Sequence, residues 1–236
     1  MFALIWVLIF FLGLAVGSFV NCLVYRLNTG RQSLWGRSFC DYCQHKLPWY
    51  DNLPLLSFLL LRGKCRWCHS PIGVHYPLVE LLTGILFVWI YLWVKSWSGN
   101  TLSFYISISL YLYISASFIA LFLSDLQYRT IPDQITYPAI LISLIFLIFQ
   151  YPSILISNLL SGLGAAGFFF LLVLLTRFRG MGLGDVKLAG LMGLFLGFPK
   201  VIVALYLAFL TGATAGVILI LLGKKKFKSQ ISFGHF

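Results

Sequence analysis

Two of the six acidic residues in this chain of 236 residues stand at the ends of long apolar runs. Asp125 follows one such run, and Asp185 precedes another and closes the motif Gly182-Leu183-Gly184-Asp185. A carboxylate is costly beside an apolar run, so a residue kept there marks a functional site. Two such carboxylates predict a shared proton and an activated water, the chemistry by which paired aspartates hydrolyse peptides.

The helix ends next to these residues predict different protonation states for the two carboxylates. A helix carboxyl terminus before Asp125 disfavours a second negative charge, whereas a helix amino terminus at Asp185 favours the ionised form. We therefore expect Asp125 to be the protonated partner and Asp185 to be the base. A helix cap is the alternative account of Asp185, and it is the leading account of Asp133, which follows Pro132.

Four cysteines form two pairs in the one sizeable polar segment of the chain. Each pair has Cys-x-x-Cys spacing and 21 residues separate the pairs, which is typical of a tetrahedral zinc site made by Cys40, Cys43, Cys65 and Cys68. Four thiolates leave no coordination position for water, so the zinc is expected to be structural. Disulfides are the alternative, and a reducing cytosol disfavours them. His45 and His69 adjoin the pairs and are either substitute ligands or bystanders.

The composition indicates a membrane protein with several spans. Hydrophobic residues make up 60% of the chain and the mean hydropathy is +0.94, values that exclude an ordinary water-soluble protein. A helix needs about 20 apolar residues to cross the hydrocarbon core. We predict an all-α transmembrane bundle of seven spans, at residues 2–24, 76–94, 102–124, 134–150, 153–176, 185–199 and 201–222. The sixth is short and glycine-rich, so it is tilted less, packed inside the bundle or only partly inserted.

These spans divide the chain into four predicted parts. Residues 1–24 form the first transmembrane helix, 25–75 a cytoplasmic zinc segment, 76–222 the transmembrane catalytic bundle and 223–236 a basic cytoplasmic tail. The apolar run at 53–61 is too short to cross the membrane. It therefore either packs under the zinc segment or lies on the membrane surface.

Lysine and arginine residues cluster in loops on one side of the predicted bundle. Seven of the 17 lie between the first two spans, and short loops rich in these residues stay in the cytoplasm. This places the amino terminus outside and both aspartates at the cytoplasmic edge of the membrane. The net charge of +11 is interpreted as attraction to anionic membrane lipids, because no basic domain suited to nucleic acid is present in the sequence.

Several ordered motifs resemble those of the type IV prepilin peptidases, membrane aspartic proteases with a Gly-x-Gly-Asp motif. The motifs are Gly17-Ser18-Phe19-Val20-Asn21, the paired cysteines, Trp49-Tyr50-Asp51-Asn52-Leu53-Pro54, Tyr76-Pro77-Leu78-Val79-Glu80-Leu81-Leu82-Thr83-Gly84 and the two aspartate segments. The likeness covers nearly the whole chain. Chains of that family commonly continue through Pro-Phe-Gly-Pro-Phe into another span, so the tail at 223–236 is interpreted as truncated.

The resemblance implies that Asp125 and Asp185 are the catalytic pair of an aspartic endopeptidase of the inner membrane. Its implied substrates are prepilins and pseudopilins, whose leader peptides are cut on the cytoplasmic side. A second implied activity is methylation of the new amino terminus with S-adenosylmethionine. Candidate substrate-binding residues are Gly182 and Gly184, which leave space for a main chain, and Glu80, for which a cap or an arginine pair is the alternative.

Two other classes of function stay open at this point. A proton-coupled transporter would use the same two aspartates as a proton relay, and it predicts no peptide cleavage. A membrane-assembly scaffold would use only the zinc segment to dock partners. It predicts that asparagine is tolerated in place of both aspartates.

Overall fold

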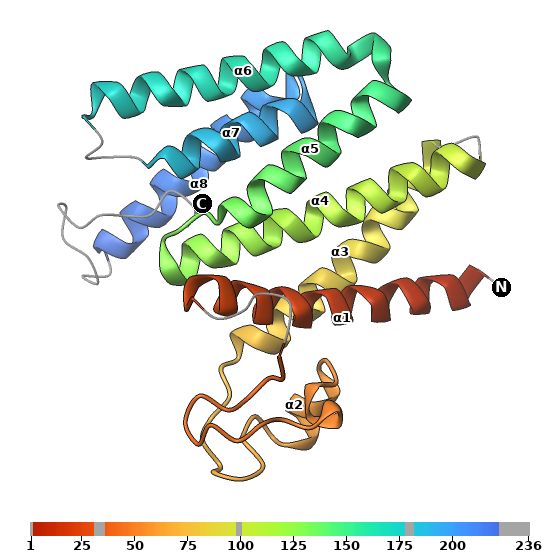
Figure 1. The fold of residues 1–236 in the computed structure, drawn as a ribbon, viewed down its shortest axis with the longest axis vertical. Coiled ribbons are helices and arrows are strands. Elements are labelled where there is room, and N and C mark those ends of the chain that lie inside the picture. The colour runs from red at the N-terminus through yellow and green to blue at the C-terminus, as the bar shows by residue number, and fades with distance from the viewer. Residues whose placement is uncertain (1, 31–35, 98–100, 178–181, 222–236) are drawn as a thin grey trace. The chain divides into compact units, whose positions relative to one another are not determined.

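The computed structural model describes residues 2–30, 36–97, 101–177 and 182–221 (Figure 1). All regular elements in these ranges are helices, which confirms the all-α prediction. The chain divides into two compact units, Met1–Ala120 and Leu121–Phe236. The division falls inside the bundle predicted at 76–222, and the predicted tail at 223–236 lies outside the described residues.

The first unit is built on two long helices, α1 (Phe2–Asn28) and α3 (His75–Trp97), followed by most of α4 (Thr101–Tyr128). Glycines allow α1 and α3 to pack closely. A Cβ atom on Gly13 would lie 2.7 Å from the Cα atom of Gly84. Gly17, four residues later on the same side of α1, approaches the Cα atom of Glu80 in the same way. Small residues at this spacing let membrane helices associate through their backbones.

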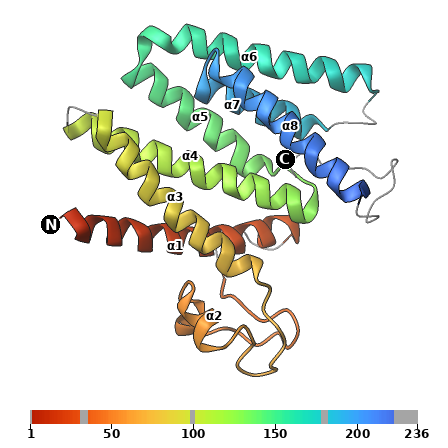
Figure 2. The same cartoon turned by 180° about the vertical axis from the view of Figure 1, so that it is seen from behind.

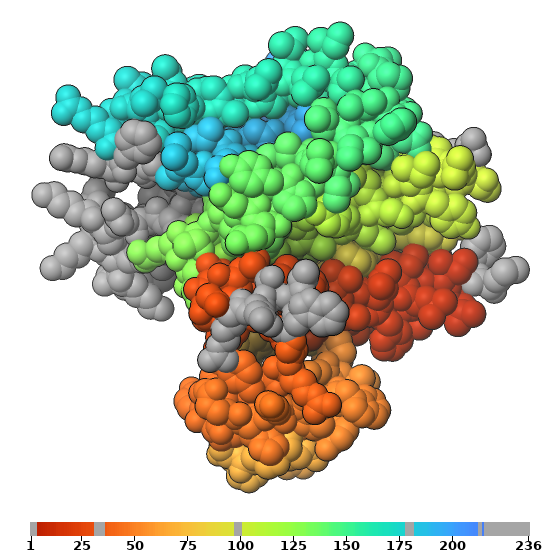
Figure 3. Space-filling model, viewed as in Figure 1, coloured from red at the N-terminus to blue at the C-terminus, as the bar shows by residue number. Residues whose placement is uncertain are grey.

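The polar segment between α1 and α3 forms a lobe of the first unit, coloured orange in Figure 3. We refer to its described residues, 36–74, as the cysteine segment. It contains a short 3-10 helix, η1 (Trp49–Asn52), and a short α-helix, α2 (Leu56–Leu60). An ion pair of 2.7 Å between Arg66 and the buried carboxylate of Asp51 ties its two halves together.

The second unit contains the end of α4 and the helices α5 (Asp133–Gln150), α6 (Pro152–Leu175), α7 (Leu183–Leu196) and α8 (Lys200–Leu221). Helix α7 packs against α6 and α5 (Figure 2). A Cβ atom on Gly193 of α7 would lie 2.7 Å from the Cα atom of Gly162 on α6. The Asn158 amide donates a hydrogen bond of 3.0 Å to the Leu194 carbonyl, which fixes the far end of α7.

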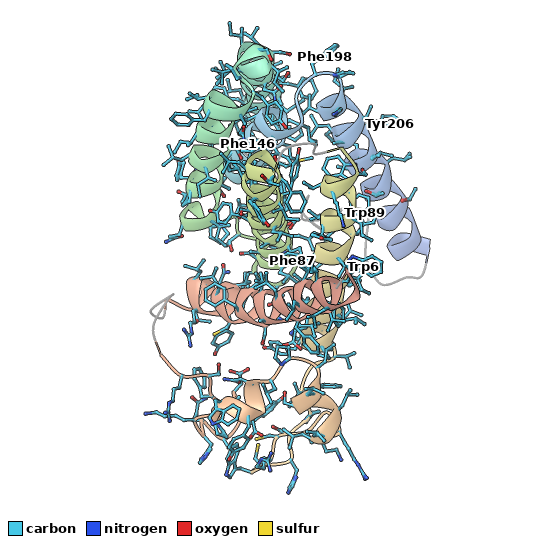
Figure 4. All side chains as sticks on the ribbon, turned by 90° about the vertical axis from the view of Figure 1, so that its right-hand side faces the viewer. Trp6, Phe87, Trp89, Phe146, Phe198 and Tyr206 are labelled. Carbon is cyan, nitrogen blue, oxygen red and sulfur yellow. The ribbon has the colours of Figure 1, made fainter. Side chains whose placement is uncertain are left out.

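Within the part of the chain that the structure describes, five helices are long and apolar enough to cross a membrane: α1, α3, α4, α5 and α6. Each predicted span corresponds to a helix, but the number seven is not confirmed. Helix α7 has only 14 residues, and the apolar stretch Lys200–Thr211 of α8 is also shorter than a span. On α3, Trp89 points outward and Phe87 is buried (Figure 4). Exposed aromatic and aliphatic side chains of this kind suit contact with lipid, so the chain is an integral membrane protein.

Candidate active site

Asp125 lies in the last turn of α4, because the helix continues to Tyr128 and does not end at residue 124 as predicted. Its side chain is buried, with 7% of the residue exposed. The helix closes at Arg129, which has a left-handed φ of 56° and donates its N–H to the Asp125 carbonyl at 2.9 Å. The adjacent Ser124 hydroxyl lies 3.2 Å from the hydroxyl of Thr130 beyond the helix end. Asp125 is thus held on a closed helix terminus.

Asp185 lies in the first turn of α7, with Gly182 as the residue that caps the helix. The Asp185 carboxylate accepts a hydrogen bond from the Gly182 N–H at 3.2 Å, and the Asp185 N–H donates to the Gly182 carbonyl at the same distance. The side chain therefore does cap its own helix, as the structural alternative predicted. One of its oxygens is engaged in this way.

The carboxylates of Asp185 and Asp125 interact electrostatically, although their segments are far apart in sequence. Asp185 lies outside the five spanning helices, and burial raises its pKa above the ordinary value of an aspartate. The Gly182 N–H opposes this shift, and the negative charge of Asp125 adds to it. The helix amino terminus favours the ionised form of Asp185, as expected, but burial outweighs this effect and the pKa of Asp185 is raised overall.

Two contacts seat the first turn of α7 beside the connection that follows α4. A Cβ atom on Gly184 would lie 2.9 Å from the Cβ atom of Ile131, so the glycine gives room to that side chain. Lys187 donates a hydrogen bond of 2.6 Å to Asp133, and its ammonium lies 5.0 Å from the centre of the Tyr137 ring. Asp133, interpreted as a cap from sequence, is the first residue of α5 and forms this ion pair.

Sequence reasoning missed the role of Lys187. The available signal was a lysine two residues after Asp185 in an otherwise apolar helix, outside the predicted cytoplasmic loops. A cation in that position needs a partner, and Asp133 is one of only six acids in the chain. The ion pair could therefore have been proposed from charge alone.

The four cysteines gather as predicted. Their sulfur atoms all lie within 4.8 Å of one another, and the Sγ atoms of Cys40 and Cys68 are 3.7 Å apart. Tetrahedral zinc with bonds of about 2.3 Å separates its sulfur ligands by about 3.8 Å, whereas a disulfide bond is about 2.05 Å long. The cluster therefore fits zinc. His45 stacks against Trp67, with ring centres 3.9 Å apart, and does not belong to the cluster.

The two cysteine pairs have the same local backbone. In each pair, the residue after the second cysteine has a left-handed conformation, with φ of 57° at Gln44 and 56° at His69. Its N–H donates to the carbonyl of the first cysteine, at 2.8 Å for Cys40 and 3.1 Å for Cys65. Each turn brings its own two thiols to one side. The two Cys-x-x-Cys pairs therefore form the same backbone turn.

A cavity of about 640 Å³ lies in the first unit, between the end of α1, the cysteine segment and the first turns of α3. Glu80 lines it and accepts a hydrogen bond of 2.8 Å from the Leu55 N–H. Asn21 also lines it and donates its amide to the Tyr76 carbonyl at 3.2 Å. The buried Oδ1 atom of Asn21 has no hydrogen-bond partner within the described ranges. A buried acceptor of this kind needs a donor from a ligand or water.

Comparison with known proteins gives the family. Residues 11–94 match the Bacterial Peptidase A24 N-terminal domain, and residues 112–217 match the Type IV leader peptidase family. The prepilin leader peptidase/N-methyltransferase of Aeromonas hydrophila is 32% identical, over 97% of this chain and 86% of the relative. The chain therefore belongs to the type IV leader peptidase family. The resemblance seen in the sequence is confirmed.

Two other leader peptidases extend the comparison. The prepilin leader peptidase/N-methyltransferase of Neisseria gonorrhoeae is 33% identical, over 88% of this chain and 80% of the relative. The prepilin leader peptidase/N-methyltransferase of Burkholderia pseudomallei strain K96243 is 30% identical, over 95% of this chain and 80% of the relative. No solved structure is significantly similar to the chain. The first matched region lies within the first structural unit, and the second begins at residue 112, near the end of that unit, and continues through the second. This leader peptidase carries the cysteine segment in the first unit and the two aspartates in the second.

Proposed function

We propose that the chain is an aspartic endopeptidase that cleaves the leader peptides of prepilins and pseudopilins at the cytoplasmic face of the inner membrane. The observation that carries this proposal is the electrostatic interaction between the buried Asp125 at the end of α4 and the half-buried Asp185 at the start of α7. The names of the relatives support the substrate class. The clustering of lysine and arginine residues in the loops on one side of the bundle supports a cytoplasmic position of the two aspartates.

The two carboxylates would act as one unit that holds a single proton. The ionised carboxylate removes a proton from a water molecule, which attacks the scissile carbonyl carbon, while the protonated carboxyl donates a hydrogen bond to the carbonyl oxygen. The tetrahedral intermediate then collapses, the C–N bond breaks and the leaving amine takes a proton from the pair. Because interacting acids titrate jointly, the proton belongs to the pair and we assign neither residue as the permanent base.

The leader peptide would approach the acids at Gly182. Among the described residues, the nearest atom to an added Cβ there is the Gly184 nitrogen at 3.8 Å, so on that side the position is open to a neighbouring main chain. Gly184 differs, since Ile131 already occupies the space beside it. We therefore propose Gly182 as the substrate-contacting glycine and Gly184 as the glycine that seats the turn.

Cleavage of a prepilin leader peptide by purified protein tests this function. Asp125→Asn and Asp185→Asn should each abolish product formation, because either change leaves the pair without its shared proton. Asp41→Asn, an exposed acid of the cysteine segment, is the matched control and should cleave normally. Wild-type protein that transports protons in vesicles but leaves the peptide intact would support the transporter instead. A wild-type protein that neither cleaves the peptide nor transports protons would support the scaffold, and cleavage by both aspartate variants would refute the assignment of these acids as the catalytic pair.

We also propose that Cys40, Cys43, Cys65 and Cys68 hold one structural zinc ion. The support is the chemistry of the donor set and its spacing, with four sulfur atoms within 4.8 Å of one another. With all four positions filled by thiolates, the ion would organise the cysteine segment and would not activate water.

A second activity, N-methylation of the new amino terminus, is favoured by the cavity in the first unit. S-adenosylmethionine supplies the methyl group as a sulfonium and carries amine donors. The buried carboxylate of Glu80 and the unpaired Oδ1 atom of Asn21 suit such a cationic, donor-rich molecule. Glu80→Gln should weaken binding of S-adenosylmethionine in a calorimetric titration and leave leader cleavage in place. Lys64→Gln, on the exposed surface of the cysteine segment, is the control, and equal binding by both variants would contradict the assignment.

A further inference from the structure

The short helix α2 has two chemically different sides. Phe58 and Leu61 line the cavity of the first unit. The other side carries leucines with exposed fractions of 51% at Leu56, 69% at Leu59 and 80% at Leu60. Together with the exposed Leu53 that precedes the helix, these form the leucine patch: Leu53, Leu56, Leu59 and Leu60. Four exposed leucines side by side on the most polar segment of the chain indicate a surface that contacts an apolar partner.

The position of α2 along α3 places the patch at the depth of lipid. The Leu55 N–H, at the start of α2, donates to the Glu80 carboxylate at 2.8 Å. Glu80 follows the start of the spanning stretch His75–Ser96 by five residues, or about 7.5 Å at 1.5 Å per residue. Leu78 and Leu82, exposed on the same turns of α3, must also meet lipid.

The length of α3 fixes this depth further. Its 22-residue spanning stretch is about 33 Å long, slightly more than the hydrocarbon core of about 30 Å. The first two turns therefore lie where head groups give way to acyl chains. Because the start of α2 is hydrogen-bonded to Glu80 in the second turn of α3, the leucine patch lies at the same boundary.

Charges and aromatic groups around the patch fit this boundary. Arg62 and Lys64 follow α2 directly, and both are exposed. Cations next to an apolar face are attracted to anionic head groups. The 3-10 helix η1 packs beside α2 and exposes Trp49 and Tyr50, residue types that favour the membrane interface.

We propose that the leucine patch is a membrane-contact surface, with α2 lying in the interface of a bilayer that contains anionic lipid. Leu56, Leu59 and Leu60 enter the outer part of the acyl region, while Arg62 and Lys64 contact head-group phosphates. The same helix forms part of the cavity wall through Phe58. Contact with lipid therefore fixes one wall of that cavity, and the cysteine segment lies on the bilayer and not free in solution.

Photocrosslinking in nanodiscs tests the proposal on the full chain. Benzoylphenylalanine replaces Leu60 or, as a second reporter, Leu59, and the protein is embedded in phosphatidylethanolamine with phosphatidylglycerol. The matched control carries the probe at Gln44, an exposed polar position of the first cysteine turn. After irradiation, intact-mass analysis counts the adducts with lipid. Both reporters lie on the exposed side, so the fold should tolerate them, and zinc content checks this.

Lipid adducts should be at least five-fold more abundant at Leu59 and Leu60 than at Gln44. Raising the phosphatidylglycerol fraction should increase them in the wild-type background but not when Arg62 and Lys64 are both changed to glutamine. Equal labelling at all three positions would overturn the proposal. Crosslinks from Leu59 or Leu60 to protein, either to the second unit of the same chain or to another copy, would also overturn it, since they would identify a protein partner for the patch.

Discussion

Replacing Gly184 with alanine tests whether the seat against Ile131 sets the position of Asp185. The new Cβ atom would lie 2.9 Å from Cβ and 3.1 Å from Cδ1 of Ile131. Relaxed carbon atoms are about 3.5–4.0 Å apart, so the turn must move by about 0.6 Å or more, and the neighbouring Asp185 moves with it. A misplacement near 1 Å costs on the order of 100-fold in rate, so we expect kcat to fall by about 10-fold to 100-fold.

The same substitution should change stability only modestly. Position 184 lies in the first turn of α7, where alanine gains up to about 1 kcal/mol over glycine in helix propensity. Overpacking against Ile131 costs about 1–3 kcal/mol. The two effects partly offset one another and leave a net destabilisation of about 0–2 kcal/mol, which a thermal unfolding scan can measure. The loss should therefore appear mainly in kcat and not in the amount of folded enzyme.

The assay is steady-state cleavage of a prepilin leader peptide in detergent. Gly164→Ala on α6 is the matched control, because no described atom lies within 4 Å of an added Cβ atom there, and it should cleave like wild type. Adding Ile131→Ala to Gly184→Ala removes the Cγ1 and Cδ1 atoms from the clash and should restore part of the lost rate. Wild-type kcat in Gly184→Ala, with both aspartate variants inactive, would refute the positioning argument.

Three further outcomes follow from other contacts. Lys187→Met should leave the melting temperature nearly unchanged, since exposed ion pairs such as Lys187–Asp133 contribute at most about 1 kcal/mol. The value of kcat should nevertheless fall several-fold, because this pair seats the first turn of α7, and an unchanged kcat would contradict that role. A chelator should remove one zinc ion per chain and raise amide hydrogen exchange across residues 36–74; unchanged exchange would contradict the structural role. The pH profile of kcat/KM should be bell-shaped. Its acid limb should lie above the pKa of an ordinary aspartate, because the pKa of Asp185 is raised. Activity should vanish at low pH, where both acids are protonated, and at high pH, where the shared proton is lost.

Features that depend on local spacing could be predicted from the sequence. The cysteine turns are set by Cys-x-x-Cys, because the backbone of each turn already points both thiols to one side. The apolar runs correspond to helices, because a backbone in hydrocarbon must satisfy its own hydrogen bonds. The short, glycine-rich sixth run was expected to behave differently, and α7 indeed has only 14 residues and packs on α6 through Gly193.

Features that depend on tertiary contacts could not be predicted. The apolar run before Asp125 stops at residue 124, but the helix backbone continues to Tyr128 because hydropathy does not decide where a helix ends. The effect of a helix amino terminus on Asp185 could be estimated from sequence, whereas its burial could not, and burial is the larger effect. Likewise, nothing in the motif shows that Ile131 fills the space beside Gly184.

The two candidate sites belong to different structural units, and the chemistry of the substrate sets the order of the proposed reactions. The aspartates belong to the unit Leu121–Phe236, whereas Glu80, Asn21 and the cysteines belong to Met1–Ala120. The amine that would accept a methyl group exists only after the leader bond is cut. Asp125→Asn should therefore fail to methylate an intact prepilin peptide but should methylate a synthetic peptide that starts at the mature amino terminus. Loss of both methylations in this variant, with S-adenosylmethionine still bound, would show instead that the aspartates take part in methyl transfer.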